Sequence, residues 1–530
     1  MKHRFVSALK CFVAIFCFSM ALATSPGVHG QGLDPAALLK PATDTWPTYN
    51  GDYSGRRFST LDQINATNVG SLTLAWAFRT RGNTLKSTAL EVNGILYFTA
   101  PDHVWAVDAR YGRQIWHYFR KSEGDHIGNR GLGMHGDSLY FTTPDAHLIC
   151  LNARDGNVRW NVELADPKLE YFATMAPIVV RDHVIVGVSG DVTDLPGFLE
   201  SRDPETGAVQ WRWNTEPKPG EPGSETWPKD NDALSHGGGM TWMTGTYDPQ
   251  LNLLYWGTGN PNPVLAGEGR LGDNLYTCSI VALNPDTGKL AWYFQPSPHD
   301  VHDWDATQTP VLFDAEFHGK PRKLIAQASR NGFFFVLDRT NGEHLVTAPF
   351  IDTTWSSGID SRGRPIAKPE ATPTPDGALV EPGSDGSTNW MAPSFDPQTG
   401  LFYVKARRIF SVYYNTVTTK AEGWGGRDRI LWANSTIRAL DYHTGKVAWN
   451  HELGEGEDIA GILTTAGHLL LTADNSGNLL AMDPATGAIL WHLNIGGEVV
   501  ASPMTYQLDG RQYLLIPVQD ILYAFALPEK

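Results

Sequence analysis

One pattern of apolar and polar positions recurs along the chain. Apolar residues at alternate positions lead to an Asp or Asn, which is followed by Gly four residues later and by Trp eight residues later. Six copies share this spacing: VWAVDARYGRQIW, LICLNARDGNVRW, FLESRDPETGAVQW, IVALNPDTGKLAW, IRALDYHTGKVAW and LLAMDPATGAILW. A seventh copy, FFFVLDRTNGEHLV, keeps Asp338 and Gly342 but has Val346 in place of the Trp. Self-similarity at this scale is typical of a repeat architecture.

Each copy predicts two strands joined by a tight turn. Asp or Asn opens the turn by bonding to its own backbone, and Gly takes the position that needs a positive φ. The Trp begins the outer strand, where a large flat ring can lie between neighbouring sheets. One four-stranded sheet per copy, arranged radially, is a β-propeller. The repeat therefore predicts an all-β propeller.

The two ends of the chain complete the ring in this prediction. LTLAWAFRT near the N-terminus is a strand that contains Trp76 but has no preceding turn, and RQYLLIPVQDILYAFALP near the C-terminus supplies strands with no following Trp. Paired, they form an eighth blade and remove the exposed edges. We predict eight blades, with seven as the nearest alternative. Long polar segments rich in Pro and Gly are predicted to be loops that cover one face, at residues 214–236, 261–273, 348–389 and 407–434.

The first residues predict a secretion signal. Three basic residues precede an apolar run from Cys11 to Ala23, which is shorter than the roughly 20 residues that a membrane span needs. We therefore expect a signal peptide at 1–23, a linker at 24–45 and the propeller domain at 46–530, in a protein that works in the periplasm without a membrane span. Loss of the three charges lowers the formal net charge from −15 to −18, which argues against nucleic acid or an anionic membrane as a partner.

Two cysteines remain after the signal. Cys150 and Cys278 each lie in an apolar strand pattern, and we interpret both as buried free thiols. The sequence contains no CxxCH, so this chain is not expected to carry a covalent c-type haem.

Five further motifs occur in a fixed order on the repeat. They are NRG at 129–131, VIVGVSG at 184–190, TWMTGTYDPQLNLLYWGTGNP at 241–261, GKPRKLIAQASRNGFFFVLDR at 319–339 and NWMAPSFDPQTGLFYV at 389–404. Together they resemble the pyrroloquinoline quinone (PQQ)-dependent alcohol dehydrogenases, the methanol/ethanol dehydrogenase group of quinoproteins. The resemblance extends from WPTYNGDYSGRRFSTLDQINATNVGSLTLAW to the AFALP ending, so it covers nearly the whole mature chain.

The resemblance implies a site for PQQ, a flat ortho-quinone with three carboxylates. Trp242 matches the residue on which the quinone stacks, and it lies outside the Trp position of the repeat. An arginine fork suits a carboxylate, whereas Thr174 and Ser189 are as readily ordinary strand residues. The implied cofactor-binding residues are Arg130, Thr174, Ser189, Gly190, Asp191, Trp242 and Asn389.

The resemblance also implies a base and a metal site. Asp303 matches the base that takes the hydroxyl proton of the alcohol, and Arg330 matches the cation near the reactive carbonyl. For both, a surface ion pair is the alternative. Hard oxygen donors suit Ca²⁺, and the carboxylate of Asp305 matches one found in lanthanide-dependent members. The implied metal ligands are Asn260, Asp303, Asp305 and Asp191.

Three positions depart from the family pattern. The vicinal Cys pair before NRG is absent, because the stretch here is EGDHIGNRG, and His126 is a candidate cover for the quinone. Lys86 stands where the family has a Glu that bonds to the cofactor. Val192 stands where the family has an acidic metal ligand, so Asp191 or Asp194 would take over from a shifted position.

We therefore expect a periplasmic PQQ- and metal-dependent alcohol dehydrogenase. The metal is expected to be Ca²⁺, with a lanthanide as the alternative, and electrons would pass to a separate acceptor such as a soluble cytochrome c. The competing hypothesis is a non-enzymatic propeller that binds a partner and has lost part of the PQQ site. The alcohol and the oligomeric state have no readable signal in the sequence.

Overall fold

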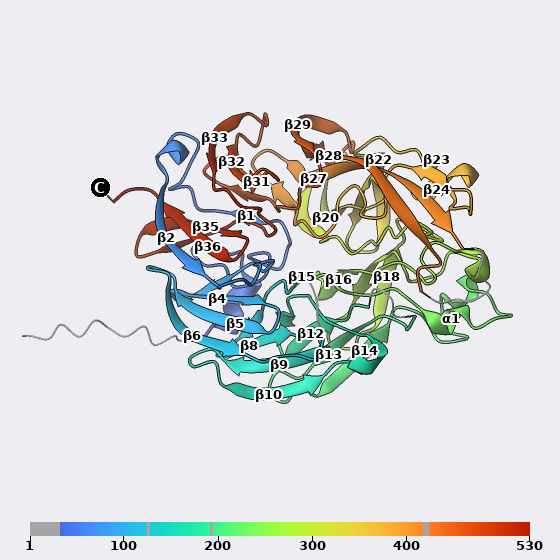
Figure 1. Cartoon of the computed structure of the whole chain (residues 1–530), viewed down its shortest axis with the longest axis horizontal. Helices are drawn as coiled ribbons and strands as arrows, with labels where there is room; N and C mark the ends of the chain where they lie inside the picture. Colours follow the sequence, from blue (N-terminus) through green and yellow to red (C-terminus); the bar gives the residue numbers. More distant parts are fainter. Residues whose placement is uncertain (1–31, 125–127, 191–193, 417–422, 530) are drawn as a thin grey trace, which may run out of the picture.

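A computed structural model describes residues 32–124, 128–190, 194–416 and 423–529. Over these ranges the chain is a β-propeller in which the sheets surround a common centre (Figure 1). The helices of the described residues are short: α1 (Ala233–His236) and six 3-10 turns, η1 (Pro35–Leu39), η2 (Val69–Ser71), η3 (Pro167–Leu169), η4 (Ser224–Thr226), η5 (Glu268–Arg270) and η6 (Pro369–Ala371). The predicted signal peptide at 1–23 lies outside the described residues.

The described strands form eight sheets of four or five strands and one two-stranded sheet. Four sheets from the first half of the chain are β3 (Leu90–Val92), β4 (Ile95–Ala100), β5 (His103–Asp108) and β6 (Arg113–Phe119); β7 (Gly133–His135), β8 (Ser138–Thr142), β9 (His147–Asn152) and β10 (Val158–Glu163); β11 (Ile178–Val180), β12 (His183–Gly187), β13 (Phe198–Arg202) and β14 (Val209–Asn214); β15 (Thr246–Asp248), β16 (Leu253–Gly257), β17 (Ile280–Leu283) and β18 (Leu290–Phe294).

The remaining sheets come from the second half of the chain and from its N-terminal strands. They are β19 (Val311–Phe317), β20 (Lys320–Ala328), β21 (Phe333–Asp338) and β22 (Glu343–Pro349); β25 (Ala378–Val380), β26 (Ser394–Asp396), β27 (Leu401–Asn415), β28 (Gly426–Asp441) and β29 (Val447–Glu455); β1 (Phe58–Ser59), β30 (Leu463–Thr465), β31 (Leu469–Ala473), β32 (Asn478–Met482) and β33 (Ile489–Asn494); β2 (Thr73–Arg79), β34 (Met504–Leu508), β35 (Arg511–Val518) and β36 (Ile521–Ala526); and the small pair β23 (Ser356–Ile359) and β24 (Pro365–Ala367).

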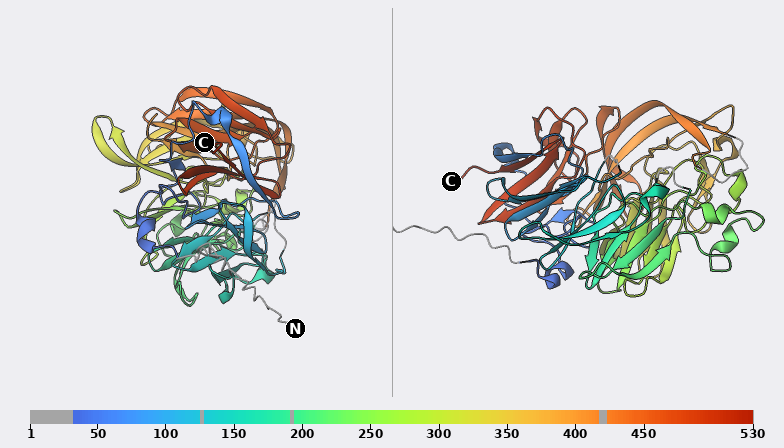
Figure 2. Two further views of the ribbon diagram at one scale, coloured as in Figure 1. Left: turned by 90° about the vertical axis from the view of Figure 1, so that its left-hand side faces the viewer. Right: turned by 60° about the horizontal axis from the view of Figure 1, so that its bottom comes forward.

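The two ends of the chain meet in one sheet. Strand β2 pairs with β36 in antiparallel register, with Trp76 opposite Ala524. Strand β1 adds in parallel to β30, so a second N-terminal strand joins a C-terminal sheet. The N-terminal strands (blue) and the C-terminal strands (red) accordingly lie side by side in both views of Figure 2. The predicted pairing of the two ends is confirmed.

In six of the eight larger sheets that the structure describes, a Trp links the sheet to the next one. The Trp116 indole lies on Gly156 of the following copy, where an added Cβ would come within 2.7 Å of the ring. Its Nε1–H donates to the carbonyl of Ala153, at 3.0 Å. The same bond is made by five other Trp residues: Trp76 to Ala109, Trp160 to Pro204, Trp211 to Pro285, Trp292 to Arg339 and Trp449 to Pro484. Gly is therefore needed for two reasons, its positive φ and the space that the ring occupies.

One predicted loop is largely strand. Residues 407–434 form most of the long hairpin β27–β28, in which Ile409, Ser411 and Tyr413 are buried and alternate with partly exposed residues. This alternation is the two-residue period of a half-buried strand. The prediction of a loop was wrong here because residue type does not follow the alternation in burial: Phe410 and Val412 are partly exposed, whereas Ser411 is buried.

Other features agree with their predictions or extend them. Cys150 and Cys278 are buried free thiols. Residues 32–45, which we predicted to be part of a linker, lie against the propeller: Leu33 forms a bridge with Gly136, and Leu38 is buried in the core. None of the helices in the described ranges has the length and apolar character needed to cross a membrane.

Candidate active site

The candidate site lies where the strands of five neighbouring sheets begin and end. In an antiparallel sheet the start of the first strand and the end of the second strand lie side by side. All of the predicted site residues in the described ranges occupy such positions: Arg130 before β7, Thr174 before β11, Ser189 and Gly190 after β12, Trp242 before β15, Asn260 after β16, Asp303 and Asp305 before β19, Arg330 after β20 and Asn389 before β26. The blade topology therefore brings together residues that are up to 259 positions apart in the chain.

A cavity of about 250 Å³ collects these residues. Its walls include every one of the ten residues just named, and Asp191 lies outside the described residues. The sequence did not identify the other residues of the wall, which are Phe172, Gly238, Met240, Asn262, Val264, Asp385, Trp390 and Trp424.

Trp242 packs against the hydrophobic core and also lines the cavity. Its Nε1–H donates to Asp305 Oδ2 at 2.8 Å, which fixes the plane of the indole. The guanidinium carbons of Arg130 and Arg330 lie 4.9 and 5.6 Å from the centre of the ring. An aromatic plate flanked by two cations suits a flat, anionic ligand.

Arg130, Thr174 and Ser189 form one polar wall. Arg130 Nη1 donates to Thr174 Oγ1, and its backbone N–H donates to the Thr174 carbonyl at 2.9 Å. Ser189 and Phe172 exchange two backbone hydrogen bonds, at 2.8 and 3.1 Å, which hold the Ser189 side chain at the cavity. The Ser189 hydroxyl is buried and has no hydrogen-bond partner among the described residues. A buried hydroxyl of this kind, beside an arginine, fits a carboxylate of PQQ.

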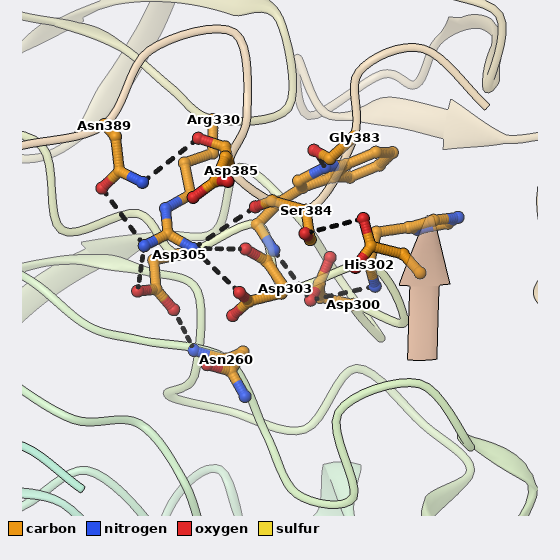
Figure 3. Close-up of polar contacts among 12 residues, drawn as sticks. Asn260, Asp300, His302, Asp303, Asp305, Arg330, Gly383, Ser384, Asp385 and Asn389 are labelled. Atoms are coloured by element: carbon orange, nitrogen blue, oxygen red, sulfur yellow. Dashed lines mark hydrogen bonds and ion pairs between the residues drawn. The ribbon is translucent and has the colours of Figure 1, made fainter. Parts of the chain in front are cut away.

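The loop before β19 carries the acidic groups (Figure 3). Arg330 lies between two of them: Nη1 is 3.2 Å from Asp303 Oδ2, and Nη2 is 3.3 Å from Asp305 Oδ2. Arg330 also donates to the Asp303 carbonyl at 2.7 Å and to Asn389 Oδ1 at 3.2 Å. Arg330 is 7% exposed, so its ion pair with Asp303 lies in the cavity wall and is not the surface ion pair of the alternative interpretation.

Asp303 adopts a conformation that L-residues seldom occupy. Its φ is +68°, and such outliers in the left-handed region concentrate at functional sites. Asp300 holds the loop: one of its carboxylate oxygens accepts from the backbone N–H of His302 at 3.3 Å and from that of Trp304 at 3.1 Å. Asp300 is 3% exposed, and its other oxygen has no partner among the described residues.

The electrostatics of this loop follow from burial and from the density of carboxylates. Burial raises the pKa of Asp303 well above its ordinary value; Asp305 and Asp300 add to the rise, and Arg330 opposes it. Burial also raises the pKa of Asp300, to about 6. Burial alone would lower the pKa of Arg330, but the nearby carboxylates outweigh it and raise that pKa. Arg330 is therefore a permanent cation at this site.

The described ranges contain oxygen donors for a metal ion but not a complete set of ligands. Asn260 donates from its side-chain amide to the Pro261 carbonyl at 3.2 Å, which leaves its amide oxygen as an acceptor, and its backbone N–H donates to Asp305 Oδ1 at 2.6 Å. Where the structure describes the chain, no group of three or more His, Cys, Asp or Glu side chains is arranged to hold a metal ion. Of the two candidate replacement ligands, Asp194 pairs with His236 at 2.9 Å, and Asp191 lies outside the described residues. The chemistry of these donors fits a hard cation.

The departures from the family pattern also have a structural setting. Lys86 Nζ lies 5.3 Å from the centre of the Trp390 ring. Burial and the nearby Arg130 lower the pKa of Lys86. The Lys86 side chain therefore lies beside one of the aromatic walls of the cavity, in surroundings that disfavour its charged form. His126 and Val192 lie outside the described residues.

Comparison with known proteins identifies relatives over nearly the whole chain. The family model described as PQQ, glucose/ethanol/alcohol dehydrogenase, β-propeller domain, matches residues 46–349 and 435–514. The quinohemoprotein alcohol dehydrogenase ADH IIB of Pseudomonas putida is 37% identical over 537 residues, which cover 94% of this chain and 77% of that protein. The structure of the quinohemoprotein alcohol dehydrogenase of Comamonas testosteroni superposes with a TM-score of 0.87 at 32% identity, covering 94% of this chain and 83% of that one. A europium-containing methanol dehydrogenase superposes with a TM-score of 0.85 at 29% identity, covering 92% of this chain and 98% of that one.

Proposed function

The chain belongs to the PQQ glucose/ethanol/alcohol dehydrogenase family of β-propellers, and we propose that it is a PQQ- and metal-dependent enzyme that oxidises an alcohol to an aldehyde or ketone. The observation that carries this proposal is the cavity in which Trp242, Arg330 and Asp303 lie together. An aromatic plate, a permanent cation and a carboxylate at one cavity are the groups that quinone-dependent oxidation of an alcohol needs from the protein.

The residues divide the task between them. Trp242 supports the cofactor ring, and Arg130, Thr174 and Ser189 bind its carboxylates. When bound, PQQ supplies a hydride acceptor, and the metal polarises the reacting carbonyl. Asp303 accepts the proton of the alcohol hydroxyl, and Arg330 stabilises negative charge that develops beside it.

Further parts of the proposal concern the ring, the metal and the compartment. The eight four- and five-stranded sheets are the eight blades. The metal is held by Asn260 and Asp303, with Asp305 and Asp191 as further ligands. We favour Ca²⁺, although the europium-containing structural relative makes a lanthanide the ion to test beside it. Residues 1–23 direct the protein to the periplasm, where a separate acceptor such as a soluble cytochrome c takes the electrons.

Reconstitution tests the proposal directly. Protein freed of cofactor is mixed with PQQ and with either Ca²⁺ or a lanthanide, and reduction of an artificial dye is followed with a panel of alcohols. We expect turnover with one of the metals. An Asp303→Asn variant should keep PQQ but lose about 10²–10⁴-fold in kcat, as for loss of a general base. The proposal would be rejected if the mixture showed no quinone absorbance and no turnover with any of the metals.

The competing hypothesis, a propeller that only binds a partner, is less well supported. A propeller that had lost PQQ binding would not be expected to keep its cations, its aromatic plate and the buried Ser189 hydroxyl, which has no hydrogen-bond partner among the described residues, around one cavity. The same reconstitution separates the two hypotheses, because a binding propeller would not turn over any alcohol.

A further inference from the structure

One sheet has an open edge in the part of the chain that the structure describes. Strand β28 pairs with β27 along its whole length, whereas β29 pairs only with the stretch from Asn434 to Leu440. The Gly456 N–H then bonds to the Ala433 carbonyl at 3.0 Å, just after β29 has ended. Residues 426–433 of β28 therefore have a strand on one side only, where the hairpin extends towards the loops around α1 (Figure 1). Such an edge leaves backbone N–H and C=O groups available to another strand.

The middle of this edge is apolar and exposed. Ile430 is 41% exposed, Leu431 53% and Trp432 39%. Three consecutive large hydrophobic residues on a free edge form the kind of segment that pairs with a further strand. Proteins commonly protect such edges with charged side chains or with a bulge. The bulge opposite Phe410 and the neighbouring charges therefore limit which strand can be added.

Charged residues of opposite sign lie at the two ends of the edge. Arg427 and Arg429 are exposed at its beginning, and Glu455 is exposed at its far end, where β29 stops. Within the described ranges none of these three residues forms an ion pair. The guanidinium of Arg427 lies 5.5 Å from the centre of the Tyr414 ring, a contact that does not neutralise its charge. The edge is thus positive at one end and negative at the other.

The opposite charges project from the same face of the sheet. Residues that are directly opposite each other in an antiparallel pair share a face, as do residues two, four or six positions apart on one strand. Arg427 is opposite Tyr414, and Asn434 is opposite Arg408. Tyr414 and Arg408 are an even number of positions apart on β27, and Glu455 is opposite Asn434. Arg427 and Glu455 therefore lie on one face.

A second copy of the chain matches this order of charges. In an antiparallel pair the beginning of one strand lies beside the end of the other. A twofold axis perpendicular to the sheet, close to Ile430, brings Arg427 of each copy towards Glu455 of the other. Each contact then occurs twice, as in any isologous interface. The two faces stay continuous across the axis, so the paired charges remain on the same side.

We propose that the protein forms a homodimer in which the free edges of two β28 strands pair in antiparallel orientation about Ile430. The inference goes beyond the proposed function, because neither PQQ nor the alcohol takes part in the contact. The chain has a formal net charge of −15, so two copies repel each other at long range. The local pairs of arginine and glutamate offset this repulsion and select the antiparallel arrangement.

The order of charges gives a test with an internal rescue. The masses of the purified wild type, Arg427→Glu and Glu455→Arg are measured by analytical ultracentrifugation in about 0.15 M salt, where long-range repulsion is screened. We expect the wild type to be a dimer. Each variant sets like charges together twice, so its dimer Kd should rise about tenfold or more. An equimolar mixture of the two variants should form a dimer again, because each reversed charge then faces an opposite one.

Two controls keep these results specific. Arg113→Glu makes the same change of charge at an exposed arginine of β6, in a different sheet, and should leave the dimer intact. Melting temperatures of the variants equal to that of the wild type show that each chain is folded. The rescue by mixing gives a further check, since a misfolded variant would not be rescued.

A cysteine at the axis tests the orientation of the strands. An antiparallel pair places opposite Cα atoms about 4.5–5.5 Å apart, which a disulfide can span. Ile430→Cys should therefore give a disulfide-linked dimer on mild oxidation. Ile489→Cys is the matched control, because Ile489 is 46% exposed on β33 of another sheet; it should stay unlinked. The native thiols, Cys150 and Cys278, are buried and do not compete.

Several results would overturn the inference. One is a wild type that stays monomeric up to about 100 μM, a concentration at which even weak contacts are populated. Others are a dimer that neither charge reversal weakens, a mixture of the two variants that remains monomeric, and an Ile430→Cys variant that cross-links no more than Ile489→Cys. None of these measurements involves oxidation of an alcohol, so failure of the dimer and failure of the proposed function are distinguishable.

Discussion

Replacement of Asp300 should misplace the catalytic base without touching it. One carboxylate oxygen of Asp300 bonds to the backbone N–H groups of His302 and Trp304, the residues on either side of Asp303. Asp303 has a φ of +68°, a conformation that costs an L-residue roughly 1–2 kcal/mol. The two bonds hold the loop in this conformation, so their loss lets Asp303 relax away from Arg330.

The size of the effect follows from these contacts. A hydrogen bond to a charged acceptor contributes roughly 1.5–3 kcal/mol, and buried N–H groups left without partners add to the loss. We expect Asp300→Ala to lower the free energy of unfolding by about 2–4 kcal/mol. A misplacement of about 1 Å in a reacting group lowers rates by roughly 10²-fold, so kcat should fall by about that factor while KM changes little. Asp300→Asn keeps an oxygen that can accept both bonds and should restore most of kcat.

The charge of Asp300 gives the same variants a pH signature. Burial raises its pKa from 3.8 to about 6, so the folded protein binds a proton more tightly than the unfolded chain does. Stability from this group is therefore fully present below about pH 4 and is lost as the pH rises through about 6. A rise of about two units corresponds to about 3 kcal/mol.

The assay is urea unfolding of the metal-free protein between pH 4 and pH 7, together with steady-state kinetics of the reconstituted enzyme. Asp300→Asn should reduce the loss of stability between pH 4 and pH 7 by up to about 3 kcal/mol relative to the wild type. An Asp300→Ala variant with the kcat of the wild type would refute the positioning role, and an Asp300→Asn variant that is as slow as Asp300→Ala would show that two retained hydrogen bonds are insufficient.

Three further changes have defined outcomes. Lys86→Glu should weaken PQQ binding about tenfold or more at low ionic strength, because it reverses a charge near a tricarboxylate; unchanged or tighter binding in a fluorescence titration would contradict this. Asp305→Ala should destabilise the protein by about 2–4 kcal/mol even in the presence of a chelator, because three N–H donors lose a charged acceptor. If Asp305 served only as a metal ligand, the substitution would leave the melting temperature of the metal-free protein unchanged. Gly342→Ala should destabilise more than Gly319→Ala: both have a φ of +76°, but only at 342 does the new Cβ meet a ring, that of Trp292 at 2.7 Å. Equal melting temperatures for the two variants would mean that the ring makes no contribution.

The repeat was predictable because its causes are local. The Asp or Asn, the Gly and the Trp of each copy lie within nine residues, and the same three groups form the turn and the contact with the next sheet. The pairing of β2 with β36 was predictable because each end of the chain lacked what the other supplied. The hairpin β27–β28 was not predictable, because apolar residues such as Phe410 and Val412 also occupy its partly exposed positions and so obscure the two-residue alternation of the strand.

The site was predictable only where motifs carry it. Trp242 and Arg330 each lie in a motif that resembles a known family, Asp303 matches the base of that family, and the structure brings all three to one cavity. Trp424 and Asp385 were missed because they lie in loops whose position depends on contacts with distant segments. Trp424 reaches the cavity only because the hairpin that carries it is bonded to residues about 160 positions earlier in the chain.

Asp305 shows how geometry changes a role suggested by resemblance. The resemblance makes it an additional metal ligand, but in the structure it is already the acceptor that joins Trp242, Asn260 and Arg330. An ionised carboxylate offers about four lone-pair positions, and these three N–H groups already occupy most of them. A metal ion that binds Asp305 therefore adds to a set of contacts that the carboxylate makes without the ion. Loss of Asp305 should consequently disturb the aromatic plate, the loop of the base and the metal site together, whichever ion the protein uses.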